Sequence, residues 1–386
     1  MIDFKFRPLA YSVRGLFVCT LVRMHRTLPL LVLALMLNHC VDPTVPEYDY
    51  ATGFLLVDGR ITNEVGESRV QLSRSAVQFG DFVLSPLRSA RVYSVGDGEE
   101  AVEWKESGAV GTFVPPDDLV LTTGRAYHIR IETAEGEVIE SVAEKLLPVV
   151  PIQRLQVTFD QEAYFSTELD RFVPAFSLLA DVNAPGEQDN FYQFRHRTFE
   201  RTGVCATCFQ GVYRRGECVR DPSVDFYDYL CDRTCWRIDR SQRVTIFSDQ
   251  LSAGSELRNV LAGQVVYNGS GGMLAVVEMA AISPAAYTYL EQLVSLTEAS
   301  GGLNAPLPAP LYGNLRDRSD QGTNVLGYVS VATLSTERIY WARDSYGGTP
   351  LIPPRGPQTE PLAPAPPSAP CSGPNLTDQQ PEGWPD

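Results

Sequence analysis

Phe54-Leu55-Leu56-Val57 is the first of seven short apolar segments that lie between Phe54 and about Ser141 and are separated by turn residues. Short segments at about eight- to twelve-residue spacing, with no helical period, are typical of an antiparallel β-sandwich of immunoglobulin-like type. We therefore predict a β-sandwich domain over residues 54–147. The other six segments are Arg69-Val70-Gln71-Leu72, Ala90-Arg91-Val92-Tyr93, Val102-Glu103-Trp104, Gly111-Thr112-Phe113-Val114, Tyr127-His128-Ile129-Arg130-Ile131 and Val138-Ile139-Glu140.

A second, larger domain is predicted over residues 152–345, after a stiff hinge at Pro148-Val149-Val150-Pro151. One helix is expected after Ser283, which can cap it, with Pro284 in its first turn. The predicted fold class is thus mainly β, an immunoglobulin-like sandwich followed by a β-rich domain with at least one packed helix. The strand segments expected in the second domain are 152–159, 176–182, 191–199, 244–247, 274–282 and 325–331.

The first 39 residues resemble an export signal. Arg23 and Arg26 precede an apolar run, Leu28 to Leu37, which at about ten residues is too short to span a bilayer as a helix. Cys40 follows at once, as in a lipoprotein signal, so we expect cleavage before Cys40 and acylation of its thiol. Met24 begins a complete signal by itself and is the expected true start. The alternative is a secretory signal or uncleaved anchor in which Cys40 is an ordinary thiol.

The net charge of the chain limits which partners are expected, and the composition of its C-terminal end indicates an extended tail. The formal net charge is −15, and removing residues 1–39 makes it more negative. Nucleic acid requires a basic surface, so it is not an expected partner. Acyl chains on Cys40 would then be the only membrane contact, after a linker over residues 40–53. A C-terminal tail over 346–386 holds nine prolines between residues 350 and 370 and is expected to be extended and tied back to the body through its final Cys and Trp.

Six cysteines remain once the signal and the anchor are set aside. An even number in an exported chain predicts three disulfides, with the pairing left open. The spacing also resembles a zinc site, but an oxidising compartment and a sixth cysteine favour disulfides, so no metal and no cofactor are expected. The six are Cys205, Cys208, Cys218, Cys231, Cys235 and Cys371.

The cysteine-rich segment 205–235 is also rich in aromatic side chains. A stapled loop loses little entropy on docking, so we predict that Phe226, Tyr227 and Tyr229 bind a partner. The competing interpretation is that these rings pack inward as a small core under the loop.

Catalytic motifs are not evident. His128 and His196 are the histidines of the mature chain, and neither lies in a nucleophile motif. No HExxH, P-loop or GxGxxG sequence occurs. We therefore expect a protein that is not an enzyme and has no catalytic residues, although carboxylate pairs assembled in space leave no local mark.

Three further stretches carry a family resemblance: Ser283 to Leu290, Pro310-Leu311-Tyr312-Gly313-Asn314-Leu315, and Asn324-Val325-Leu326-Gly327-Tyr328-Val329-Ser330. Together with Leu55 to Ile61, they resemble a Bacteroidota lipoprotein family catalogued as domain of unknown function 4249. That resemblance covers about Cys40 to Trp384. It implies a lipid-anchored protein of the outer membrane, exposed on the surface, beside a TonB-dependent receptor, because members are typically encoded next to such receptors.

The leading hypothesis from the sequence is a non-catalytic accessory or substrate-binding partner of a TonB-dependent transporter. Two alternatives remain open: a surface hydrolase whose carboxylates cannot be paired from sequence, and a purely structural subunit of an outer-membrane assembly.

Overall fold

The computed structural model describes residues 53–78, 81–186, 189–250, 256–298, 311–319, 321–352, 355–361 and 365–386. The predicted signal segment and Cys40 lie outside these residues, as does nearly all of the linker 40–53. The described residues all fall within one compact unit, Ala51–Asp386. They are mainly β, as predicted, and among them no helix is long and apolar enough to cross a membrane.

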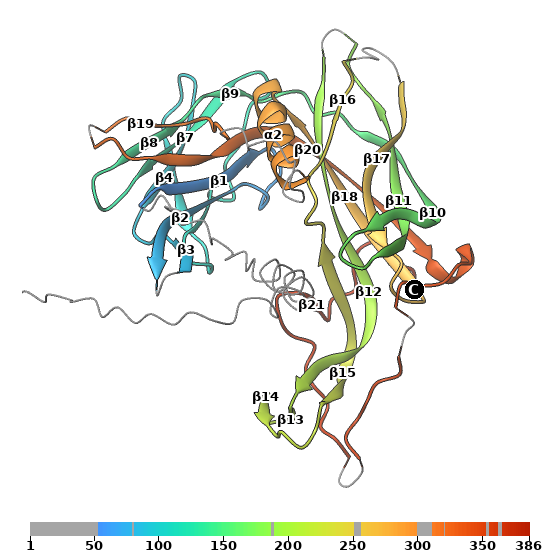
Figure 1. Cartoon of the computed structure of the whole chain (residues 1–386). Coiled ribbons are helices and arrows are strands. Elements are labelled where there is room, and N and C mark those ends of the chain that lie inside the picture. Colours follow the sequence, from blue (N-terminus) through green and yellow to red (C-terminus); the bar gives the residue numbers. More distant parts are fainter. Residues whose placement is uncertain are drawn as a thin grey trace, which may run out of the picture. The chain divides into compact units, whose positions relative to one another are not determined.

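The seven strand segments predicted in the N-terminal part are all confirmed (Figure 1). Side chains alternate between buried and more exposed positions along these strands, as in β4 and β7. Val57, Leu72 and Ile129 are among the fully buried residues of their shared core. The strands are β1 (Leu55–Thr62), β2 (Arg69–Gln78), β3 (Asp81–Pro86), β4 (Arg91–Gly96), β5 (Val102–Glu106), β6 (Thr112–Val114), β7 (Ala126–Glu132), β8 (Val138–Ser141) and β9 (Glu144–Lys145).

Two strands from late in the chain join this N-terminal part. β19 (Leu315–Asp317) pairs with β8, and β20 (Val325–Ala342) pairs in parallel with β1. β20 is also antiparallel to β18 (Gly272–Ile282). Its first half places Val329 and Val331 in the N-terminal core, whereas Trp341 belongs to the second core. The predicted division near residues 147–152 falls between the two cores, but β20 belongs to both.

The second core lies between two sheets. A three-stranded sheet, β10 (Ile152–Ser166), β11 (Arg171–Asn183) and β17 (Glu256–Val266), contributes Phe176 and Val260. The larger sheet contributes Tyr192 and Phe194 from β12 (Phe191–Phe209), with Ala275 from β18. β16 (Thr245–Ser248) pairs with the first residues of β12. All six strand segments predicted for this part coincide with strands; five of these are longer than predicted, and β16 has the predicted length but begins one residue later.

Helix α2 (Pro284–Glu298) covers part of the other face of the larger sheet. The Ser283 hydroxyl accepts a hydrogen bond from the Ala286 N–H at 3.0 Å, so the predicted N-cap is confirmed. Tyr287 and Leu290 pack on a cluster that includes Phe191 and Ile282. Beyond that cluster the same sheet face is not covered by the helix.

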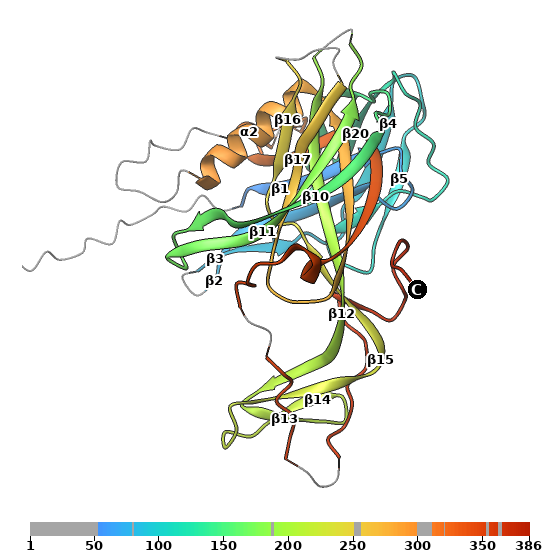
Figure 2. The same ribbon diagram turned by 90° about the vertical axis from the view of Figure 1, so that its right-hand side faces the viewer.

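The predicted disulfide loop is instead a β-structured projection, which we call the disulfide arm (residues 202–235). β12 and β15 (Phe226–Arg240) continue beyond the core as an antiparallel ladder, and β13 (Gly211–Arg214) pairs with β14 (Glu217–Arg220) near its end (Figures 1 and 2). Part of the Pro-rich tail follows the arm, and its Ala369 is buried in a small cluster there. After the 3-10 helix η2 (Arg343–Tyr346), the tail contributes β21 (Leu376–Thr377) to the edge of β15, and Trp384 beyond it packs on Trp236.

Candidate functional site

An arginine-lined cavity of about 340 Å³ lies where α2 no longer covers the large sheet. We call it the arginine groove. Adjacent strands β2, β1, β20, β18 and β12 supply most of its lining. The β1–β2 turn, the end of β15 and the turn before β16 supply the rest. Six arginines line it against only two glutamates, although the whole chain has a net charge of −15. The charged lining residues are Arg60, Arg69, Arg195, Arg197, Arg240, Arg243, Glu67 and Glu278.

Arg60 is buried and its charge is satisfied within the protein. Its guanidinium contacts both Glu67 and Glu278 at 2.5 Å, and its Nε donates to the Glu67 carbonyl at 2.8 Å. A buried arginine needs such partners, because an unpaired buried charge costs several kcal/mol. Arg60 and Glu278 therefore form the floor of the groove.

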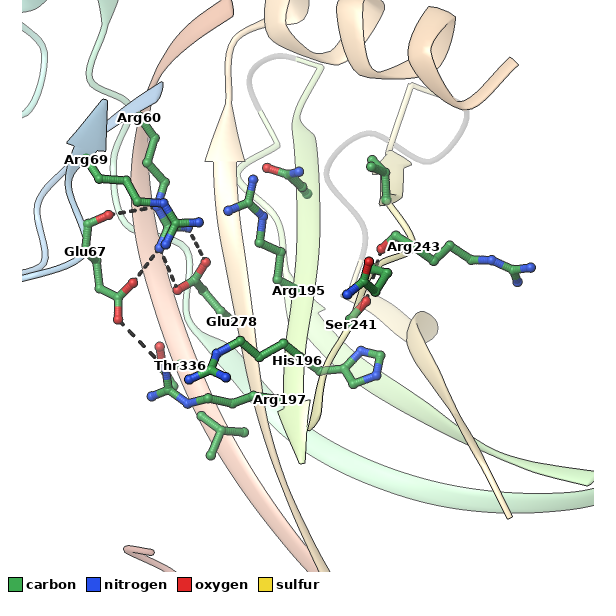
Figure 3. Close-up of a pocket in the computed structure, with 15 residues that line it drawn as sticks. Arg60, Glu67, Arg69, Arg195, His196, Arg197, Ser241, Arg243, Glu278 and Thr336 are labelled. Carbon is green, nitrogen blue, oxygen red and sulfur yellow. Dashed lines mark hydrogen bonds and ion pairs between the residues drawn. The ribbon is translucent and has the colours of Figure 1, made fainter. Parts of the chain in front are cut away.

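Arg195 lies beside this pair without sharing it. In the β12–β18 register it stands directly opposite Glu278, but the Glu278 carboxylate is directed to Arg60 (Figure 3). Within the described part of the chain, no hydrogen bond or ion pair joins the half-buried Arg195 guanidinium. Burial lowers the pKa of Arg195, and the neighbouring charge of Arg60 lowers it further.

A second like-charge contact lies across β1 and β2. Arg60 and Arg69 are direct cross-strand partners, an arrangement that is destabilising between like charges. Arg197, two residues after Arg195 on β12, reaches Glu67 only at 4.0 Å. Figure 3 shows Arg195 and Arg197 on the side of β12 that faces Arg60 and Arg69.

His196 points away from this group, toward the second core (Figure 3). Its ring hydrogen-bonds the backbone of Gln264, its Nδ1 has no partner among the described residues, and burial lowers its pKa to about 4. A Cβ on Gly263 would lie only 2.3 Å from that Nδ1, so the ring fits here only because residue 263 is glycine. His196 is thus a neutral buried group and not a base aimed into the groove.

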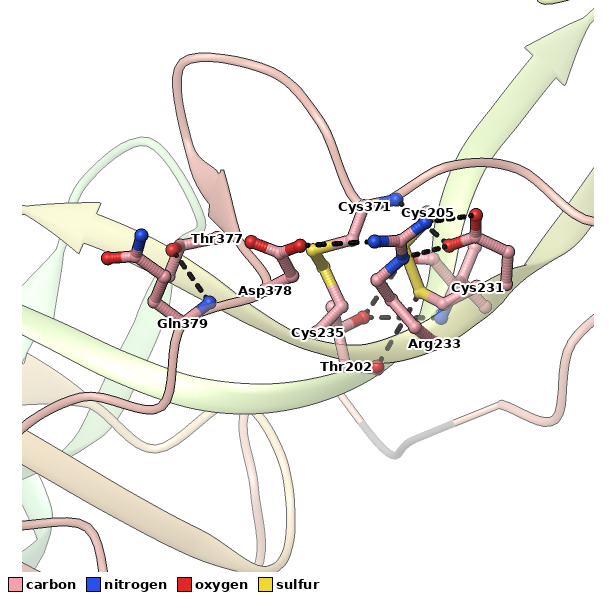
Figure 4. The surroundings of a disulfide bond; sticks show 11 residues. Thr202, Cys205, Cys231, Arg233, Cys235, Cys371, Thr377, Asp378 and Gln379 are labelled. Atoms are coloured by element: carbon pink, nitrogen blue, oxygen red, sulfur yellow. Dashed lines mark hydrogen bonds and ion pairs between the residues drawn. A yellow bond between two sulfur atoms is a disulfide. The ribbon is translucent and has the colours of Figure 1, made fainter.

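The six predicted disulfide cysteines form three bonds, as expected: Cys205–Cys231, Cys208–Cys218 and Cys235–Cys371. The sulfurs of Cys205, Cys235 and Cys371 lie within 4.8 Å of one another, but each is bonded to another sulfur and cannot act as a thiolate ligand (Figure 4). The first two bonds lie within the disulfide arm, and the third fastens the tail to its base.

The predicted contact residues of the arm divide into two groups. Tyr229 is only 1 % exposed, its hydroxyl is hydrogen-bonded to Glu360, and its ring packs on Tyr213 at 5.2 Å. Tyr229 therefore belongs to the small inward core and cannot contact a partner directly. Tyr227 is half-buried against the same cluster. Phe226 is half-buried and its ring lies 6.0 Å from Phe209, which is 77 % exposed at the end of the ladder.

The residues that carry the family resemblance have structural contacts. The Asn314 side chain donates to the Val329 carbonyl at 2.8 Å and accepts from the Val329 N–H at 3.0 Å. Tyr328 donates from its hydroxyl to Glu144, which also accepts from Ser283 at 2.8 Å. Burial raises the pKa of Glu144. These contacts fasten β20 and the start of α2 to the N-terminal part.

The sequence does not identify Glu144 as a buried contact residue, because it is a single acid in a segment, Ala143 to Leu147, that carries no motif. The groove arginines were missed for a related reason, since they come from segments far apart in the chain.

The fold and the site define the class of protein: it is mainly β, with an arm held by disulfides and a polar groove lined by arginines. A family model described as domain of unknown function (DUF4249) matches residues 41–338, more than half of the chain. The protein belongs to that family. No curated protein matches it.

Proposed function

We propose that this protein is a non-catalytic lipoprotein of the outer membrane that serves as an accessory or substrate-binding partner of a TonB-dependent transporter. The family membership supports this proposal through the partner that the family resemblance implies. The observation that carries it is the disulfide arm, whose construction suits a docking element.

Two disulfides and the β12–β15 ladder, which is irregular between Thr202 and Ala206 and regular beyond it, stiffen the arm. A rigid surface loses less conformational entropy on binding than a mobile loop does. At its end, Phe209 and Phe226 form an aromatic pair, and aromatic side chains are enriched among the residues that dominate binding energy. We therefore assign the partner contact to Phe209 and Phe226.

Substitution of Phe209 and Phe226 together by Ser tests the contact. The chain offers a matched control in Phe165 and Phe172, a second exposed ring pair at 5.3 Å, which is also replaced by Ser. The arm variant should no longer co-purify with a receptor from native outer membranes, while its Tm and the behaviour of the control variant stay unchanged. Equal co-purification of both variants would count against the arm.

The lipid anchor is tested separately. Intact-mass measurement of the membrane-extracted protein should show an N-terminus at Cys40 carrying acyl chains, and Cys40→Ser should release the protein from the membrane. A mature N-terminus elsewhere without acyl mass contradicts the anchor.

A further inference from the structure

The arginine groove contains more positive charge than the protein itself neutralises. Arg60 is saturated by Glu67 and Glu278. Arg240 is engaged by Asn375, and Arg243 lies over the Tyr164 ring at 5.7 Å. Arg69 and Arg195, by contrast, make no ion pair or hydrogen bond within the described residues, and Arg197 has only the distant Glu67.

Holding these three guanidiniums together is unfavourable in the absence of a ligand. Arg195 is half-buried beside Arg60, and Arg69 stands opposite Arg60 in the sheet. Glu278 and Asp58 offset only part of this repulsion, because the pKa of Arg195 is still lowered overall. Glu278 and Glu67 are bound to Arg60. An anion between Arg69, Arg195 and Arg197 would convert the like-charge repulsion into attraction, with little rearrangement of the sheet.

The number and origin of the arginines indicate the class of anion. Guanidiniums bind carboxylate and phosphate oxygens through paired hydrogen bonds. A carboxylate has two oxygens, whereas a phosphoryl group has three, which can be shared among donors that come from β2 on one side and β12 on the other. The cavity of about 340 Å³ also exceeds the need of one small ion, and Gln193, Ser241 and Thr336 add neutral polar groups to its lining.

We propose that the arginine groove is a binding site for a phosphomonoester, held by Arg195 with Arg69 and Arg197, whose polar remainder contacts the neutral lining. This site is separate from the disulfide arm, so it can hold or fail independently of the proposed partner contact. The phosphomonoester could come from a free sugar phosphate or from a phospholipid headgroup, and the two sources are distinguished below.

Isothermal titration calorimetry of the full chain at low salt is the first test. Glucose 6-phosphate should bind and glucose should not, with affinity falling as salt rises. Arg195→Gln should weaken binding by about tenfold or more, the loss expected for one charge-assisted contact, and Arg69→Gln should weaken it as well. Arg243→Gln is the matched control, because it removes an arginine of the same cavity that points away (Figure 3), and it should leave the affinity unchanged.

Arg195 has no ion-pair or hydrogen-bond partner among the described residues, so its replacement should not unfold the chain, and a melting curve of each variant checks this. Glucose 6-phosphate binding no tighter than glucose, or equal losses in Arg195→Gln and Arg243→Gln, would overturn the proposal.

Vesicles of equal parts phosphatidylcholine and phosphatidic acid distinguish the sources of the phosphomonoester. Sedimentation with these vesicles that is lost in Arg195→Gln supports the site with a lipid headgroup as its ligand. Sedimentation that persists in Arg195→Gln, without binding of glucose 6-phosphate, overturns it.

Discussion

Gly313 and Gly327 approach so closely that a Cβ on Gly313 would lie 1.7 Å from the Gly327 carbonyl oxygen. Gly327 is itself confined, since its φ is +106° and a Cβ there would lie 1.9 Å from the Val57 carbonyl oxygen. Both glycines belong to the stretches that carry the family resemblance. The contact is between backbones, so no side chain can move aside to relieve a substitution.

Gly327→Ala should therefore destabilise the protein by about 3 kcal/mol or more, through a clash with β1 added to backbone strain. Urea denaturation of the purified chain measures this loss. Gly322→Ala is the matched control, because Gly322 also has positive φ (+68°) but a Cβ there meets nothing within 4 Å. Its cost should be only about 1 kcal/mol. Equal costs would show that strain, and not the contact with β1, matters at Gly327.

Replacement of Arg195 by Met should raise the thermal stability of the ligand-free protein. Met fills space along the sheet without adding to the repulsion from Arg60 and Arg69, and it removes a half-buried charge for which the described part of the chain supplies no ion pair. A gain of about 1 kcal/mol is expected. Arg60→Met should have the opposite effect and cost about 3–5 kcal/mol, because it leaves Glu67 and Glu278 without their shared partner. Differential scanning calorimetry of both variants checks the signs, and a lower Tm for Arg195→Met would contradict the prediction.

His196 should make the protein less stable as the pH falls from 6.5 toward 4. Its folded-state pKa is lowered from 6.5 to about 4, so the unfolded chain takes up the proton first throughout this interval. The contribution of neutral His196 to the free energy of unfolding is fully present above pH 6.5. The loss of this contribution approaches about 3 kcal/mol once the pH is below both the unfolded and the folded pKa. The difference in unfolding free energy between wild type and His196→Asn should shrink accordingly as the pH falls, while carboxylates common to both proteins cancel. An unchanged difference would count against the prediction, as would the same trend in His128→Asn.

The three disulfides should differ in their contribution to stability. Cys235–Cys371 closes 136 residues and holds the tail, so its removal by paired Ser substitutions should cost about 2–5 kcal/mol and expose the tail to protease. Cys208–Cys218 closes only 10 residues near the end of the arm and should cost less. Thermal melts with limited proteolysis compare the two variants. Alkylation of the unreduced, denatured protein should find no free thiol among the six cysteines.

The local elements could be predicted because their signals are local. Period-two alternation identified the strands, and Ser283 followed by Pro284 identified the start of α2. The number of disulfides followed from the even cysteine count together with the predicted export of the chain. The pairing did not, because Cys371 reaches Cys235 only after the tail has folded back along the arm.

The candidate site could not be predicted, because register brings its residues together. Arg69 meets Arg60 through the β1–β2 ladder, and Arg195 reaches the same face only through β12, β18 and β20. A slip of one residue on β12 would turn Arg195 into the core. Tyr229 was misplaced for a similar reason: its aromatic neighbours suggested a surface, whereas Glu360 and Ala369 from the tail bury it.

The position of β20 between the two cores also bears on how the chain folds. Leu55 pairs with Val325, so the N-terminal strands expose one unsatisfied edge until most of the chain has been synthesised. Contacts between residues so distant in sequence slow folding, because the chain must lose the conformational entropy of closing a long loop before these contacts form. We expect slow, all-or-none maturation, during which the open edge of β1 is the point most exposed to aggregation.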